Sequence, residues 1–172
     1  MGHIEGPVSQ TPWSPDFVVQ ALELLVVYGS PEGIVRLRPV HAGSLQLGWP
    51  PGSTADAVLI AALARYGLEA RILHSTSWRH DGEHVVLTYL AVVDPPPAAN
   101  ENLAPEPVGR TQLARGAATV APASIQVDQV VEHALRHLSW LLSDDPAVAA
   151  ALPDWAPLLD AYVPEPFRQL EG

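Results

Sequence analysis

Histidines and a carboxylate gather in one short stretch of the sequence, and these residue types bind metal ions or move protons. His80, Glu83 and His84 surround the dipeptide Asp81-Gly82. Two histidines and a carboxylate form the zinc ligands of many enzymes. Asp-Gly, however, is also a strong signal for a two-residue β-hairpin turn, and residues at a hairpin tip are usually solvated. We therefore expect polar surface groups around a turn here, with a zinc site as the alternative.

A second pair of histidines, His133 and His137, is spaced four residues apart in a helical pattern. This spacing places both side chains on one side of a helix, where a third ligand would complete a metal site. The sequence offers no obvious third ligand. Both residues lie beside the apolar stripe of the helix and close to Trp140, and tryptophan is enriched at protein interfaces. We expect His133, His137 and Trp140 to form a subunit contact, and we expect no metal site.

Nucleophilic catalysis is not supported by the sequence. Ser75, Thr76 and Ser77 follow His74, but no G-x-S-x-G elbow is present and no acid is placed to complete a triad. Cysteine is absent, which excludes a thiol nucleophile, thiolate metal ligands and disulfides. Phosphate-loop and dinucleotide-binding spacings are also absent. The sequence predicts no cofactor.

The charge and hydrophobicity of the chain narrow its class and its partners. The net charge of −10 argues against nucleic acids and anionic membranes as partners. A hydrophobic fraction of 48% indicates a globular protein, and no apolar run is long enough to span a membrane. Because no secretory signal is visible, we expect a cytoplasmic protein. Nine arginines without lysine, and 18 prolines, are typical of a GC-rich, actinobacterial-type genome.

The elements that position these residues follow from apolar patterns and turn signals. An apolar run over 17–28 ends at a turn, and an alternating strand over 34–41 and a short strand follow it. A helix is predicted from Thr54 to Tyr66, with Ser53 as its N-cap and Gly67 just beyond its end. Strands over 69–78 and 84–93 form the hairpin.

The second half of the chain predicts a long loop and then helices. Residues 94–123 are rich in proline and form a long loop or lid. Apolar residues recur at helical spacing over 127–143, and Asp145-Pro146 begins another helix. We expect one domain over 17–163, between a flexible tail over 1–16 and a C-terminal tail over 164–172. The element order predicts an α+β fold, in which a mixed sheet lies between helices and extra helices follow at the C-terminal end.

Residues 48–68, GWPPGSTADAVLIAALARYGL, resemble the motif of Nudix domains, G-x5-E-x7-R-E-U-x-E-E-x-G-U with U aliphatic. Gly67-Leu68 matches the end of this motif, and the surrounding element order is similar to a Nudix domain. The resemblance implies a Nudix-like fold whose helix holds divalent metal against a nucleoside diphosphate substrate. Counting back from Gly67, however, places Ala61 at the first glutamate of the helix, and Ala64 and Arg65 at its paired glutamates. The arginine of the motif falls on Ile60.

Alanine, arginine and isoleucine at these positions remove the metal-binding chemistry of the motif. Mg²⁺ requires hard oxygen ligands, usually carboxylates, phosphates and waters. Alanine offers no such ligand, and Arg65 repels the ion. We therefore predict a degenerate Nudix-like domain without pyrophosphohydrolase activity.

The remaining prediction is a binding function, for a small nucleotide-like ligand or for a protein partner, together with homodimerisation. Aromatic rings and arginines are suited to stacking and to phosphate contact. The candidate ligand-binding residues are Arg36, Arg38, Trp49, Trp78, His80, Glu83 and Tyr89, and ordinary packing is their alternative role. A divergent hydrolase is the alternative function. It would act on a nucleoside diphosphate derivative through relocated groups such as His80, Glu83 or the 94–123 loop.

Overall fold

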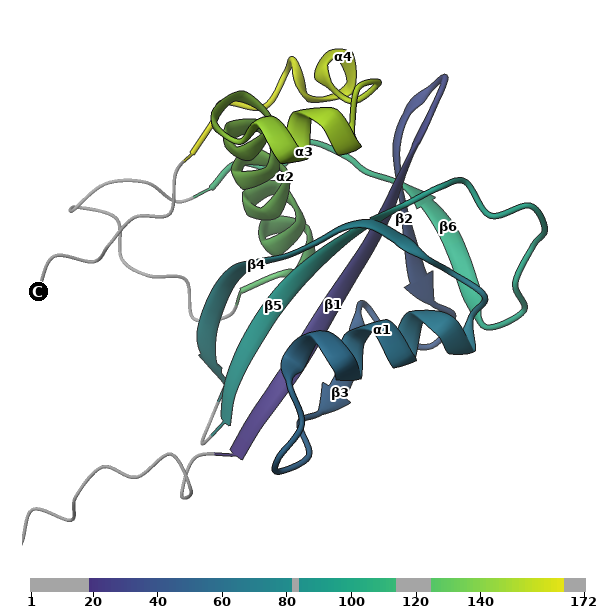
Figure 1. The fold of residues 1–172 in the computed structure, drawn as a ribbon, viewed down its shortest axis with the longest axis vertical. Helices are drawn as coiled ribbons and strands as arrows, with labels where there is room; N and C mark the ends of the chain where they lie inside the picture. The colour runs from purple at the N-terminus through teal and green to yellow at the C-terminus, as the bar shows by residue number, and fades with distance from the viewer. Residues whose placement is uncertain (1–18, 82–83, 114–124, 166–172) are drawn as a thin grey trace, which may run out of the picture.

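The computed structural model describes residues 19–81, 84–113 and 125–165, which form a sheet with helices on both faces (Figure 1). The element order confirms the predicted α+β class. In chain order the elements are β1 (Val19–Ser30), β2 (Gly33–Pro39), β3 (Leu45–Gly48), α1 (Ala55–Arg65), β4 (Ala70–Asp81), β5 (His84–Val93), β6 (Leu103–Pro107), α2 (Val127–Asp144), α3 (Pro146–Ala151) and α4 (Ala156–Leu159).

The sheet is mixed, and β1 lies at its centre. Within the described residues, its six strands run in the order β4-β5-β1-β2-β6, and β3 also pairs with β1. One edge of β1 pairs in parallel with β5, from Val19 opposite His84 to Val27 opposite Val92. The other edge pairs antiparallel with β3 and then with β2. A strand paired on both edges and covered on both faces must be apolar nearly throughout, which explains the apolar run that begins the domain.

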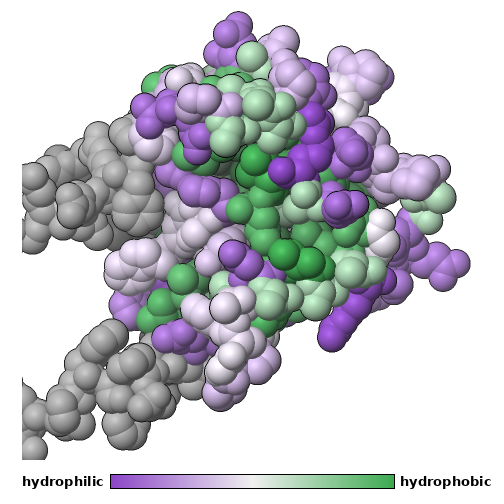
Figure 2. Space-filling model, in the orientation of Figure 1, coloured by the Kyte–Doolittle hydropathy of each residue, from purple (hydrophilic) through white to green (hydrophobic). Residues whose placement is uncertain are grey.

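Side chains of β1 alternate between two separate cores. Leu22, Leu24 and Val26 pack on the face that α1 covers, whereas Leu25 and Val27 pack on the face that α2, α3 and α4 cover. Figure 1 shows α1 well apart from the three C-terminal helices. On the side of the molecule seen in Figure 2, hydrophobic residues gather near the centre, between these two groups of helices. The predicted sheet between helices, with extra C-terminal helices, is therefore present.

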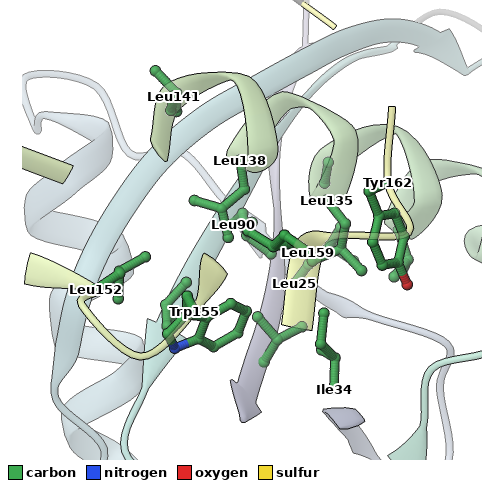
Figure 3. Close-up of a cluster of buried hydrophobic side chains, with 14 of the residues drawn as sticks. Leu25, Ile34, Leu90, Leu135, Leu138, Leu141, Leu152, Trp155, Leu159 and Tyr162 are labelled. Atoms are coloured by element: carbon green, nitrogen blue, oxygen red, sulfur yellow. The ribbon is translucent and has the colours of Figure 1, made fainter. Parts of the chain in front are cut away.

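Trp155 anchors the core on the side of the C-terminal helices. This side chain is 1% exposed and lies in one cluster with Leu25 of β1 and Leu90 of β5 (Figure 3). Leu135 and Leu138 of α2 reach the same cluster. The short elements after α2 are therefore part of the domain and fix α2 against the sheet.

The ends of α1 follow the predicted chemistry with a shift of one residue. Thr54, rather than Ser53, is the N-cap, because its Oγ1 accepts a hydrogen bond from the Ala57 amide at 3.3 Å. The Ser53 hydroxyl instead donates to the carbonyl of Pro50 at 2.6 Å. Gly67 ends the helix with φ of 68°, a left-handed conformation that glycine adopts without strain, as predicted.

Part of the predicted 94–123 loop is in fact a strand. β6 pairs antiparallel with β2, from Leu103 opposite Pro39 to Pro107 opposite Val35. Its prolines, Pro105 and Pro107, have no N–H donor, so they are tolerated in a strand at the sheet edge. These prolines hid the strand from pattern analysis. Residues 114–123 of the predicted loop lie outside the described residues, as do the predicted tail 1–16 and the end of the chain from 166.

None of the described helices is long and apolar enough to cross a membrane.

Candidate functional site

A pocket of about 530 Å³ lies between the end of α1 and the proline-rich segment that follows β5. Tyr28 and Leu37 of the sheet and Tyr66 at the end of α1 form part of its wall, and Pro96, Pro97 and Asn100 form another part. We call this cavity the lid pocket. Its volume lies within the range of roughly 300–1,000 Å³ that is typical of small-molecule sites.

The proline-rich wall of the lid pocket is tied to the helix by Asn100. The side-chain amide of Asn100 donates to the carbonyl of Tyr66 at 3.5 Å. Its Oδ1 accepts from the Asn102 amide at 2.8 Å, and its carbonyl accepts from the Leu103 amide at 3.3 Å. Leu103 is 3% exposed and belongs to the core beneath α1. The segment predicted to be a loop or lid is thus held at both α1 and the sheet.

The lid pocket is aromatic and carries no formal charge. No aspartate, glutamate, histidine or arginine occurs among the described residues that line it. The polar side-chain groups of the wall are the hydroxyls of Tyr28 and Tyr66 and the amide of Asn100. The C-terminal end of a helix such as α1 also carries a partial negative charge. The pocket therefore suits an uncharged planar molecule better than an anion.

The outer face of α1 does not fit the divalent metal that the motif of residues 48–68 implies. Ile60, Ala61, Ala64 and Arg65 are all exposed on this helix, and Ile60 is 57% exposed. None of them offers an oxygen ligand, which Mg²⁺ requires. Within the part of the chain that the structure describes, no three histidines or carboxylates are grouped so that they could hold a metal ion. At these four positions α1 therefore offers no oxygen ligand to a metal ion.

Arg36 and Arg38, predicted to contact phosphate, lie on the opposite face of the sheet from the lid pocket. Arg36 is paired with Val27, which packs toward the C-terminal helices. Its Nη2 lies 2.5 Å from Oε2 of Glu106 in β6, and Nε of Arg38 lies 3.4 Å from the same oxygen. Arg36 also donates to the Gly43 carbonyl at 3.2 Å. The hydrogen bond from Arg36 lowers the pKa of Glu106, and these arginines bind β2 to β6.

Trp49 and Tyr89 lie on the face of the sheet that α1 covers. They pack against the core beneath α1 and do not line the lid pocket. The indole N–H of Trp49 donates to the Ser53 carbonyl at 2.9 Å, which fixes the turn before α1. Burial raises the pKa of Tyr89, and the nearby charge of Asp56 raises it further. Both residues therefore help to position α1, which forms one wall of the pocket.

Trp78 and His80 lie together on β4, and Trp78 lines a pocket with Ser77 and Arg79 of the same strand. Trp78 is 51% exposed, and its ring meets that of His80 edge to face at 5.5 Å between centroids. β4 ends at Asp81 and β5 begins at His84, so the hairpin is present, whereas Glu83 lies outside the described residues. The six described residues among those predicted to bind ligand are thus not brought together in one cleft.

His137 is enclosed between α2 and β4, so its predicted position on a subunit interface is wrong. It is 3% exposed, because β4 covers this side of α2. Its Nε2 lies 3.2 Å from Nε2 of His74, and the nearly parallel rings have centroids 5.2 Å apart, so they meet through these edges. His133 also turns inward, with Nε2 3.3 Å from the Thr76 carbonyl oxygen. Trp140, 5.6 Å from the ring of His137, is partly buried, and its interface role stays a prediction.

The contact between His74 and His137 requires the ring that accepts the hydrogen bond to be neutral, and that ring is His137. Nδ1 of His137 lies 3.3 Å from the Glu165 carbonyl oxygen, which only accepts, so this nitrogen carries the hydrogen. Nε2 of His137 then accepts from the Nε2–H of His74. Burial lowers the pKa of both histidines. Asp145 partly opposes the shift of His74, and the Glu165 carbonyl partly opposes that of His137.

We expect the protein to lose stability as the pH falls below the ordinary histidine value of 6.5. The unfolded chain binds more protons than the folded chain below this pH, because the folded pKa values are lower, so stability falls with pH. Urea unfolding at about pH 7 and about pH 5.5 measures the effect. His74→Gln should reduce this pH dependence, whereas His41→Gln, at an exposed histidine, should not. Equal pH dependence in the wild type and His74→Gln would contradict the expectation.

Comparison with known proteins finds likenesses to solved structures. No protein-family model matches the chain, and no curated protein matches it. The Ap4A hydrolase of C. elegans is 18% identical, with a TM-score of 0.35, and the match covers 51% of this chain and 79% of that chain. A protein assigned to the nudix hydrolase family, from Chromobacterium violaceum, is 18% identical, with a TM-score of 0.40 and coverage of 85% and 94%. Neither likeness assigns a ligand or an activity to this chain.

Proposed function

We propose that this chain is a Nudix-like binding module that holds an uncharged, nucleoside-like ligand in the lid pocket and does not hydrolyse pyrophosphates. The observation that carries the proposal is the pocket itself. It has a volume of about 530 Å³, two tyrosines in its wall and no charged side chain among its described lining residues. The element order around α1 is the one that the resemblance to Nudix domains implies.

The chemistry of the wall favours a base or nucleoside over a nucleotide. Tyr28 and Tyr66 offer aromatic surface to a planar ring and hydroxyl groups to its polar edge. A phosphate group would lose hydration in the pocket without gaining a cationic partner there, and this loss is costly. The phosphate contacts expected of Arg36 and Arg38 therefore do not enter the proposal.

The absence of hydrolysis is proposed from the residue types on α1. Ala61, Ala64 and Arg65 occupy the places that need carboxylates, and all three are exposed on the helix. The test is to incubate the purified protein with Mg²⁺ and a panel of nucleoside diphosphate derivatives and to measure the hydrolysis products. We expect no product above the level of the buffer. Turnover that a chelator abolishes would overturn the non-hydrolytic proposal and favour the divergent hydrolase.

Blocking the lid pocket should weaken ligand binding. Ala98→Trp places a large ring at the pocket wall, whereas Ala61→Trp places the same ring on the outer face of α1. Calorimetry with adenosine, guanosine, cytidine and uridine should detect a ligand that Ala98→Trp weakens at least about tenfold, equivalent to roughly 1.4 kcal/mol, while Ala61→Trp leaves it unchanged. The corresponding diphosphate should bind more weakly than its nucleoside. Tighter binding of the diphosphate, or equal losses in both variants, would contradict the proposal.

A further inference from the structure

A second pocket, of about 260 Å³, lies between β4 and the first turns of α2. Ser77 and Arg79 of β4 and Val130 and His133 of α2 form much of its wall, and Ile125 lies at its rim. Val130 packs in the core of the C-terminal helices, so this pocket opens on the opposite face of the sheet from the lid pocket. We call it the β4–α2 pocket.

Arg79 in the wall of the β4–α2 pocket forms an ion pair with the buried Glu23. Two nitrogens of Arg79 hold Glu23, with Nη1 at 2.5 Å from Oε2 and Nη2 at 3.0 Å from Oε1. Glu23 is 1% exposed and also accepts hydrogen bonds from the hydroxyls of Ser44 and Thr88, each at 2.8 Å. Burial alone would raise the pKa of Glu23, but these hydrogen bonds keep the pKa below its ordinary value. The carboxylate and guanidinium are therefore both charged, and they balance each other.

Arg79 keeps hydrogen-bonding capacity beyond this ion pair. A guanidinium has five N–H donors. Its bonds to Glu23 and one from Nη1 to the Thr88 hydroxyl at 3.1 Å account for three of them. The side chain cannot swing toward solvent without leaving Glu23 buried and unpaired, which would be costly. Arg79 therefore presents fixed donors at the pocket wall, beside the hydroxyl of Ser77.

The charge balance between Arg79 and Glu23 decides which ligands the pocket takes. An anion would face an arginine whose charge Glu23 already neutralises, and the chain as a whole has a net charge of −10. A cation would find no carboxylate among the described residues that line the pocket. Val130 and Ile125 add apolar surface, and Ile125 is 51% exposed. These features favour an uncharged molecule with an apolar body and one hydrogen-bond acceptor.

The volume limits the size of this molecule. A water molecule takes about 30 Å³ of the liquid, so 260 Å³ corresponds to about nine waters. That is the space of one substituted six-membered ring. We infer that the β4–α2 pocket is a second binding site, which takes a small uncharged ring compound whose carbonyl or similar acceptor contacts Arg79 and Ser77. This site is independent of the function proposed for the lid pocket.

Three probes of one shape and different charge test the inference. Benzamide is neutral, benzoate is an anion and benzamidine is a cation. We expect benzamide to shift the backbone amide signals of Ser77, Arg79 and Val130 in saturable fashion in NMR titrations of the full chain. Benzoate and benzamidine should bind at least about tenfold more weakly, because neither finds a compensating charge. Tighter binding of either charged probe would overturn the neutral-ligand assignment, and the absence of saturable shifts would overturn the site.

Two serines on β4 supply a matched pair of variants. Ser77 lines the pocket, whereas Ser75 is exposed on the same strand and does not line it. Ser77→Phe should abolish the shifts caused by benzamide, and Ser75→Phe should retain them. Ser77→Ala, which removes only a hydroxyl, should weaken benzamide about fivefold, the effect of one hydrogen bond. Ala98→Trp should leave benzamide binding unchanged, so failure of this site is distinguishable from failure of the lid pocket. Equal binding by Ser77→Phe and Ser75→Phe would place the probe elsewhere.

Discussion

Glu132→Ala is expected to lower the free energy of unfolding by about 3–5 kcal/mol, which is the range for breaking a buried ion pair from one side. Glu132 on α2 has no exposed surface. Its Oε1 accepts from Nε of Arg136 at 2.7 Å and from Nη2 of Arg110 at 2.9 Å. Its Oε2 accepts from Nε of Arg110 at 3.1 Å and from the amide of Thr111 at 3.3 Å. Alanine would leave the largely buried Arg136 without its carboxylate.

The same substitution should also loosen the connection between β6 and the end of the chain. Arg110 lies over the ring of Tyr162, 4.2 Å from its centroid, and donates to the Ala161 carbonyl at 2.5 Å. Glu132 orients Arg110 for both contacts. Urea unfolding followed by circular dichroism measures the loss. Glu101→Ala removes an exposed carboxylate and should change stability by less than about 0.5 kcal/mol. A loss below about 1 kcal/mol for Glu132→Ala would show that water replaces the carboxylate, contrary to its buried position.

Trp155→Ala should have an effect of similar size, about 3–5 kcal/mol, for a different physical reason. The indole is 1% exposed and fills the space between Leu25 and Leu90 of the sheet and Leu152 after α3. Figure 3 shows it among these side chains. Its removal loses the free energy of burying the ring and leaves a cavity that the surrounding helices fill only in part.

A second tryptophan provides the control for Trp155→Ala. Trp78 has the same ring but is 51% exposed on β4, so Trp78→Ala should cost less than about 1 kcal/mol. Thermal unfolding of the two variants, at equal protein concentration, compares them directly. Equal losses would mean that burial of the ring does not determine its contribution, and the described core would then be wrong at this point.

Local patterns were sufficient to predict α1, the β4–β5 hairpin, α2 and the start of α3. Each rests on residues close in sequence, such as Gly67 at the end of α1 and Asp145 at the start of α3, whose Oδ1 accepts from the Ala147 amide at 2.8 Å. β6 was missed because Pro105 and Pro107 are signals for a loop. A proline lacks the backbone N–H donor, and a strand at the edge of a sheet tolerates this because one side of it is unpaired.

Neither pocket could be predicted, because each is made by residues far apart in the chain. Tyr28 and Tyr66 come together only when β1 and the end of α1 pack, and tyrosine has no spacing rule of its own. The sequence did contain a signal for the ion pair beside the β4–α2 pocket. Glu23 is the one acid within the apolar run 17–28, and a buried strand carries a charge only when a partner neutralises it. The partner, Arg79, lies 56 residues away.

The parallel pairing of β1 with β5 has a consequence for how fast the protein folds. Glu23 on β1 meets Thr88 on β5 across 65 residues, and among the described strands β5 is the parallel neighbour of β1. Contacts of such long range require a large loop to close before they gain any free energy, and proteins rich in them fold in milliseconds to seconds. During synthesis, β1 leaves the ribosome well before β5 does. Its apolar residues must therefore stay out of contact with other chains until the second half of the sheet exists.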